Sequence, residues 1–165
     1  MFNGIMNLMN SLEARYYVDI NDCIIDHTEN EYDILLAIDP MVLSITGLAV
    51  AAGGVLHYPE KQVTSIIVDD NYLSMSENGK RFTIAHELGH IVCQIEKFRS
   101  GSYVRDINDE FEADEYALEQ VGLEVALEGL NEIRSILEDN FVPEENINEI
   151  DIRIENLINK SMVTC

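Results

Sequence analysis

The feature that most constrains the fold is an apolar segment, residues 81–95, with two histidines and a glutamate within five consecutive residues. His86 and His90 are four residues apart, and Glu87 lies between them. The surrounding side chains are mostly apolar: Phe82, Ile84, Ala85, Leu88, Ile91 and Val92. This pattern predicts a helix that is buried on most sides. Polar groups inside such a helix are costly unless they are paired with charges or bound to a metal.

A helix places the two imidazoles on one face, about one turn apart, where both can bind one tetrahedral cation. Glu87 then projects to the side, where it can take a proton from a water on that cation. Zinc lowers the pKa of such a water to about 7, which supplies hydroxide for attack on a peptide carbonyl. By chance, His-Glu-x-x-His should occur in well under about one chain in a hundred of this length. The sequence therefore predicts a hydrolytic zinc site with one ion per chain.

Such a site needs a third protein ligand and one open position. The metzincin pattern would place glycine at position 93 and histidine at position 96, but the chain has Cys93 and Glu96 there. Cys93 lies on the ligand face, and we interpret it as a small buried thiol, with a role as a fourth ligand as the alternative. The third ligand is therefore expected further along the chain.

Helical geometry separates the carboxylates of residues 109–119. At 100° per residue, Glu110 and Asp114 fall on the apolar face, which the other residues there define: Phe111, Ala113, Ala117, Leu118 and Val121. The opposite face carries Glu112, Glu115 and Glu119. Buried carboxylates need compensation, so we predict Glu110 as the third ligand. Asp114 would accept the outer N–H of a ligating histidine. Glu112 stays open as the alternative ligand, and Glu110 and Asp114 could also be partly exposed near the helix end, where the helix dipole favours them.

Two further predictions concern the oxyanion and the charge. A hydrolase needs a donor for the tetrahedral oxyanion, and the candidates are Tyr116, Tyr103 and His57. The chain carries 31 acidic and 10 basic side chains, a net charge of −21. This field disfavours direct binding to nucleic acid or anionic membranes. Between residues 106 and 155 there are 17 acids against two arginines, so we expect acidic outer faces on the helices there.

The remaining pattern predicts one α+β domain, residues 1–165, with a catalytic core at about 54–122 and a helical extension at about 123–162. A small antiparallel or mixed sheet would pack on the histidine-bearing helix and the glutamate-bearing helix. Residues 54–58 and 64–68 read as paired strands, and residues 69–71 and 76–79 as loops. We expect a strand or helix at 33–38 and the following helices: 5–16, 40–52, 106–121, 123–139 and 144–160. Three cysteines, no convincing signal peptide and no membrane-length apolar run favour a cytoplasmic protein.

The chain resembles the ImmA/IrrE family of zinc metallopeptidases over about residues 54–118. The resemblance rests on Ser65-Ile-Ile-Val68, on the run from Arg81 through the histidine motif to Val92, and on Glu110-x-x-Ala-Asp114. It implies small α+β gluzincin-like enzymes that often cleave a neighbouring helix-turn-helix repressor. It also implies His86, His90 and Glu110 as ligands and Glu87 as general base.

The chain departs from the family pattern after Glu110-x-x-Ala-Asp114. Residues 116–122 replace the usual Phe-Ala and apolar continuation, and the segments 126–130 and 153–157 are more similar to soluble relatives of HtpX-type peptidases.

Three functions remain open. The first is a cytoplasmic zinc peptidase that acts on a protein or peptide substrate, with a DNA-binding repressor as the candidate partner. The second is a catalytically silent module that binds a partner through its acidic helices. The third is a metal-dependent hydrolase of a substrate other than a peptide. An intact Glu87 favours an enzyme, and no pattern in the chain predicts an oligomeric state.

Overall fold

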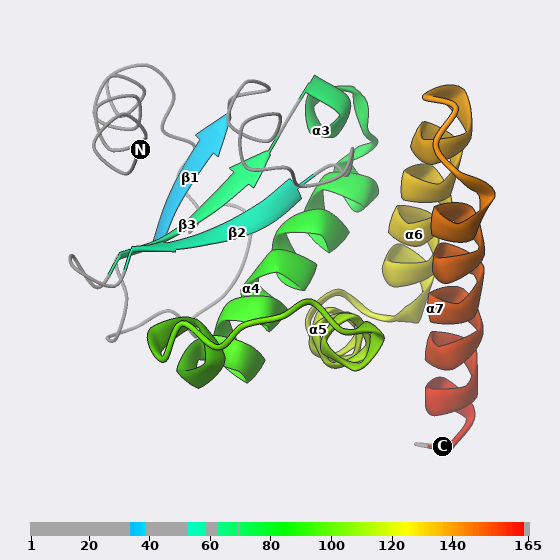
Figure 1. Ribbon diagram of the computed structural model, residues 1–165. Helices are drawn as coiled ribbons and strands as arrows, with labels where there is room; N and C mark the ends of the chain where they lie inside the picture. The colour runs from blue at the N-terminus through cyan, green and yellow to red at the C-terminus, as the bar shows by residue number, and fades with distance from the viewer. Residues whose placement is uncertain (1–33, 39–52, 59–62, 69, 164–165) are drawn as a thin grey trace.

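The structure is a computed structural model that describes residues 34–38, 53–58, 63–68 and 70–163. The described part is mostly helical, and its strands form one small sheet (Figure 1). The helices are α3 (Asp70–Ser74), α4 (Glu77–Arg99), α5 (Ile107–Val121), α6 (Leu123–Asp139) and α7 (Glu144–Val163). The helices predicted at 5–16 and 40–52 lie outside the described residues.

The sheet has the strand order β1-β3-β2. Strand β3 (Val63–Val68) is central; it runs parallel to β1 (Ile34–Ile38) and antiparallel to β2 (Gly53–Tyr58). Ile66 and Val68 alternate onto one face of β3 and are fully buried in the core. The predicted pairing of residues 54–58 with residues 64–68 is therefore present, and the ambiguous segment at 33–38 is a strand.

Helix α4 is the centre of the molecule. It packs against β2 and β3 on one side and against α5 and α6 on the other (Figure 1). Because neighbours cover it on several sides, its residues 82–91 are all buried. The apolar core around it draws on the sheet and the helices alike: Ile66, Val68, Phe82, Ile84, Leu88, Ile91, Leu130 and Leu157 among others. The apolar segment that the sequence singled out is thus the core helix.

The predicted loops at residues 69–71 and 76–79 are wrong for most of their length. Residues 70–74 form the short helix α3, and α4 begins at Glu77 rather than near Arg81. Ser76 caps α4, because its Oγ accepts the N–H of Gly79 at 3.0 Å. The Ser76 N–H in turn donates to Glu132 of α6, over 3.0 Å. The contact with α6 completes this N-cap, and residues that favour loops therefore begin a helix here.

The predicted helices at 106–121 and 123–139 match α5 and α6. Asp106 is the N-cap of α5, and its side chain accepts the N–H of Asn108 at 2.9 Å. Gly122 has φ 83°, a conformation that favours glycine, and it ends α5 and starts α6 without a longer loop.

Helix α7 packs against both α6 and α5 (Figure 1). Its predicted apolar stripe faces the core: Ile150 and Leu157 are buried, while Ile147, Ile154 and Ile158 are half-buried. Most acidic residues of α6 and α7 are exposed, as the charge pattern predicted. The contact with α5 matters for the site, because α7 thereby reaches the helix that carries Glu110 and Asp114.

Candidate metal centre

Helix α4 presents three buried polar side chains, those of His86, Glu87 and His90, which are 5%, 5% and 7% exposed. Because the histidines are one helical turn apart, their rings lie edge to face with centroids 4.6 Å apart. Their Nε2 atoms are 3.1 Å apart. The structure therefore brings both predicted histidine ligands to one point.

Glu110 of α5 joins the two histidines. Its Oε2 lies 3.4 Å from Nε2 of His86, and its Oε1 lies 3.7 Å from Nε2 of His90. One donor atom from each residue falls within 4.8 Å of the other two, a group that could hold one metal ion. Glu110 is 5% exposed, whereas Glu112 is exposed on the other face of α5. Between the two carboxylates that the sequence left open, the geometry favours Glu110.

The outer nitrogens of both histidines are held by buried acceptors. Nδ1 of His86 lies 2.8 Å from Asp114, which is fully buried, and Nδ1 of His90 lies 2.8 Å from Gln94 Oε1. The orientation of the Gln94 amide follows from its Nε2, which donates to the backbone oxygen of Asp109 at 2.8 Å. With Nδ1 as the donor in each ring, Nε2 is the free ligand atom. Two lone pairs that face each other and a carboxylate are stable only around a shared cation.

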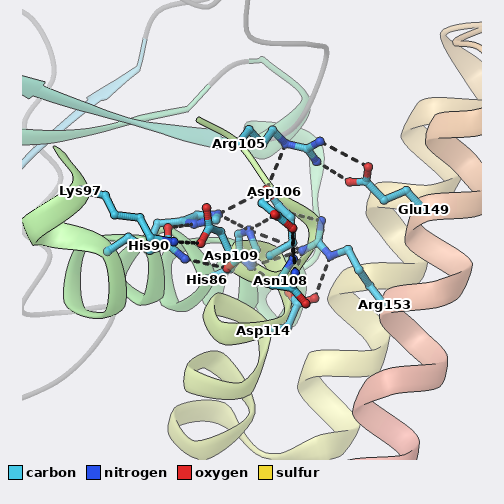
Figure 2. Close-up of polar contacts among 12 residues, drawn as sticks. His86, His90, Lys97, Arg105, Asp106, Asn108, Asp109, Asp114, Glu149 and Arg153 are labelled. Carbon is cyan, nitrogen blue, oxygen red and sulfur yellow. Dashed lines mark hydrogen bonds and ion pairs between the residues drawn. The ribbon is translucent and has the colours of Figure 1, made fainter. Parts of the chain in front are cut away.

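Two arginines contribute to the site, and neither was predicted. Arg153 of α7 is 5% exposed, and its Nε and Nη2 each donate to Asp114 over 2.7 Å (Figure 2). Its Nη1 lies 3.1 Å from Oε2 of Glu110. Arg105, on the segment between α4 and α5, places Nε 3.1 Å from Oε1 of Glu110 and also binds Glu149 of α7 (Figure 2). Both oxygens of Glu110 therefore have a guanidinium partner.

The electrostatics of the histidine pair differ sharply between its members. Burial and the charge on Arg153 lower the pKa of His86, but Asp114 and Glu110 outweigh them and raise it to about 9. Burial and the charge on His86 lower the pKa of His90 to about 4. At neutral pH the metal-free pair therefore shares one proton, which His86 carries. A divalent cation would take the place of that proton.

The pKa values of the carboxylates in the site also differ from one another. Burial works against ionisation of Glu110 and Asp114, but His86 and Arg153 hold the pKa of each well below its usual range. Burial raises the pKa of Glu87 to about 7, helped by the charges on Glu110 and Asp114. Among the site's carboxylates, Glu87 is thus the one that can exchange a proton near neutral pH.

The residues present fit a divalent metal. Two imidazoles and a carboxylate are a donor set that suits zinc. The charge also fits: with Glu87 ionised, the buried carboxylates of Glu87, Glu110 and Asp114 face one buried guanidinium, that of Arg153. With both histidines neutral, two positive charges are then missing, and one divalent ion supplies them; in the metal-free site the proton on His86 and the guanidinium of Arg105 at Glu110 supply part of that charge. Nearby Asp109 does not change this balance, because Lys97 pairs with it.

The sheet reaches the site at Gly53, the first residue of β2. A Cβ atom on Gly53 would lie 3.1 Å from Thr83 and 3.2 Å from Oε1 of Glu87. The backbone of β2 therefore lies directly against the α4 residue that is predicted to act as general base. The only described strand that pairs with β2 is β3.

The three predicted oxyanion donors differ in position. Tyr103 is half-buried, and burial together with Glu110 and Asp109 raises its pKa to about 12, so it lies close to the carboxylates. Tyr116 packs against the core instead, and the charges that raise its pKa besides burial are those of Cys93 and Glu119. His57 lies in β2 opposite Thr64, and its side chain is outside the described part of the molecule.

The prediction that Cys93 is a buried thiol is wrong. The side chain is exposed at the edge of the contact between α4 and α5, where its Sγ lies 4.0 Å from the backbone oxygen of Glu112. The ligand group among the described residues contains no sulfur.

Residues 42–130 match the family model of the peptidase M78 family, the IrrE N-terminal-like domain. The fold and the buried His-His-Glu group define a metallopeptidase-like protein. Since the match covers more than half of the chain, the chain belongs to this family. No curated protein and no solved structure matches it. The match ends in α6, so the similarity of the C-terminal segments to HtpX-type peptidases stays a prediction.

None of the described helices has the length and apolar character that crossing a membrane requires.

Proposed function

We propose that the chain is a zinc-dependent peptidase that hydrolyses a protein or peptide inside the cell. One observation carries the proposal: Nε2 of His86, Nε2 of His90 and a carboxylate oxygen of Glu110 converge, and Glu87 lies beside them on the same helix. Those three residues would hold the metal. When bound, zinc supplies Lewis-acid chemistry, which lowers the pKa of a water to about 7 and polarises a carbonyl.

Glu87 would serve as the general base. Its pKa of about 7 lies near neutral pH, where a carboxylate can both accept a proton and give it up again. In a peptidase it would accept a proton from the attacking water and pass it to the leaving amine. Tyr103, whose pKa is raised by burial and by the charges on Glu110 and Asp109, would donate from its hydroxyl, which stays protonated at neutral pH.

The substrate class follows from β2 and from charge. An extended peptide could add to the edge of β2 by main-chain hydrogen bonds, next to Glu87. The net charge of −21 would favour a basic protein substrate over an acidic one. A DNA-binding repressor, the partner that the family resemblance implies, has this character because it must bind phosphates.

The test is Glu87→Gln in the zinc-loaded full chain, with Glu96→Gln as the matched control, since Glu96 is an exposed acid on the same helix. Both proteins and the wild type are incubated with a library of basic and acidic peptides, and cleavage is measured by mass spectrometry. We expect wild type and control to cut basic peptides alike. Glu87→Gln should lose about 100-fold or more in rate while it keeps one zinc per chain.

Cleavage by Glu87→Gln at the wild-type rate would refute the assignment of the base. A zinc-loaded wild type that cuts no peptide, yet binds a basic protein as tightly as Glu87→Gln does, would instead support a silent binding module. Hydrolysis of a small ester without peptide cleavage would favour a metal-dependent hydrolase that acts on a substrate other than a peptide.

A further inference from the structure

Helix α7 lies outside the family match, which ends at residue 130, yet it inserts a charged side chain into the metal centre. Arg153 occupies the apolar stripe of α7, three residues after Ile150 and four before Leu157, both of which are buried. A guanidinium that is 5% exposed on such a stripe needs a compensating partner. Its shortest contacts are with Asp114 of α5, and it also lies 3.1 Å from Oε2 of Glu110 and 3.3 Å from Nδ1 of His86.

The contact between Arg153 and Asp114 is bidentate: the guanidinium acts as a planar fork with two donors. Nε donates to Oδ2 and Nη2 donates to Oδ1, each over 2.7 Å, so both carboxylate oxygens are held and the plane of the carboxylate is fixed. Oδ1 of Asp114 is also the acceptor for Nδ1 of His86, at 2.8 Å. The chain of contacts therefore runs from Arg153 through Asp114 to the ring of His86.

The ring orientation matters because Nε2 of His86 is a proposed ligand atom. A single hydrogen bond at Nδ1 leaves the acceptor carboxylate free to rotate unless something else holds it. Asp114 is completely buried, so water cannot take the place of Arg153. Lysine could supply the charge but only as a point donor, without the planar fork.

We propose that Arg153 is a positioning residue of the metal centre: it fixes Asp114, and Asp114 in turn orients His86. Helix α7 is then part of the active site rather than an extension behind it. The catalytic meaning of this inference rests on the proposed peptidase function, but its effect on metal binding does not. It acts through Asp114 and needs no contact of Arg153 with a substrate.

The experiment compares Arg153→Met, Arg153→Lys, Asp114→Asn and the Asp114→Asn/Arg153→Met double variant in the full chain. Arg134→Met is the matched control, because Arg134 also binds two acids, Asp151 and Glu138, but on the surface. Zinc affinity is measured by competition with a chelator, and the ligand field is followed by the absorption spectrum of the Co²⁺-loaded protein. Folding of each variant is checked by circular dichroism.

We expect Arg153→Met to weaken zinc binding about 10- to 100-fold and to change the Co²⁺ spectrum. Arg153→Lys should retain the fold and lose a smaller factor, about three- to tenfold. The double variant should lose little beyond Asp114→Asn, because the paired contact with Asp114 is already gone there; a small further loss would measure the direct contacts of Arg153 with Glu110 and His86. The Arg134→Met control should bind as the wild type does.

If Arg153→Lys has wild-type zinc affinity and a wild-type Co²⁺ spectrum, the bidentate contact of the guanidinium is not what positions Asp114. Losses that multiply in the double variant would overturn the route through Asp114. If Arg153→Met does not fold, the lysine variant and the Co²⁺ spectrum still decide. If the Arg153 variants bind metal weakly but the wild type cuts no peptide, the proposed function is rejected and this inference stands. If the wild type cuts peptides but the Arg153 variants bind metal as the wild type does, the proposed function stands and this inference is rejected.

Discussion

Gly89, between the two metal-site histidines, allows α4 and α5 to approach closely. A Cβ atom at this position would lie 2.7 Å from both Cα and the backbone oxygen of Ala113 on α5. Those are backbone atoms, so no change of rotamer can relieve the contact, and α5 itself has to move. Ala113 directly precedes Asp114 and follows Glu110 by three residues, so Gly89→Ala should displace the proposed third ligand.

The expected loss of stability is the balance of two terms. A backbone contact of 2.7 Å in a packed core is overpacking, which costs about 1–3 kcal/mol. Alanine in the interior of a helix is more favourable than glycine by about 1 kcal/mol. The net loss should be about 0–2 kcal/mol, or a fall in Tm of up to about 8 °C for a chain of this size. Zinc affinity should fall about tenfold or more, as when an orienting partner is lost.

Gly79→Ala in the same helix is the control. There the added Cβ meets the carboxylate end of Glu132 and, at 2.9 Å, the terminal methyl of Met75. Both are ends of flexible side chains and lie far from the histidines, so this variant should keep its zinc affinity; it should lose at most about 1 kcal/mol, because Glu132 has to shift from the N–H of Ser76. Thermal unfolding with chelator and zinc competition measure both quantities. The reasoning fails if Gly89→Ala binds zinc like wild type, or if Gly79→Ala loses as much.

Two further predictions follow from the site. Glu110→Gln should weaken zinc binding about 100-fold or more, while Glu112→Gln should leave it unchanged, since only Glu110 faces the histidines; equal effects of the two changes would contradict the ligand assignment. The pKa of His86 is raised from 6.5 to about 9, so its protonation stabilises the metal-free fold fully below pH 6.5 and is lost as the pH rises through 9. Urea unfolding in the presence of chelator should detect a loss of unfolding free energy of at most about 3 kcal/mol between pH 6 and pH 9.5, at 1.36 kcal/mol per pKa unit. If His86→Gln shows the same dependence of stability on pH, the titration of His86 is not its cause.

Much of the metal centre was predictable because the positions of the apolar residues along each helix show which face is buried. The His-x-x-x-His spacing predicted two rings on one face, and the apolar stripe of residues 109–121 separated Glu110 from Glu112. Both inferences need only the geometry of a single helix. Pairing of 54–58 with 64–68 was equally local, since the two segments lie only a few residues apart in the sequence.

The loops predicted at 69–71 and 76–79 failed for a physical reason. Serine, asparagine, aspartate and glycine favour turns, but they also favour helix caps. The choice at Ser76 depends on Glu132, and the side chain of Asn78 is held by Glu128 at 2.8 Å. Both glutamates lie more than 45 residues away in the sequence, so no local window contains the deciding contact.

Arg153 was missed although its position carried a signal of the same kind as that of Glu110. It stands on the apolar stripe of α7, between Ile150 and Leu157, where a charged side chain needs a buried partner. Glu110 and Asp114 are buried charges on α5, and a buried cation on another helix is the natural partner for them. Unlike charges on the buried faces of two helices must compensate each other, so the pattern of α5 already required an arginine or a metal in addition to the histidines. The structure contains the arginine, and the donor atoms of His86, His90 and Glu110 that converge beside it are the strongest physical reason to expect the ion.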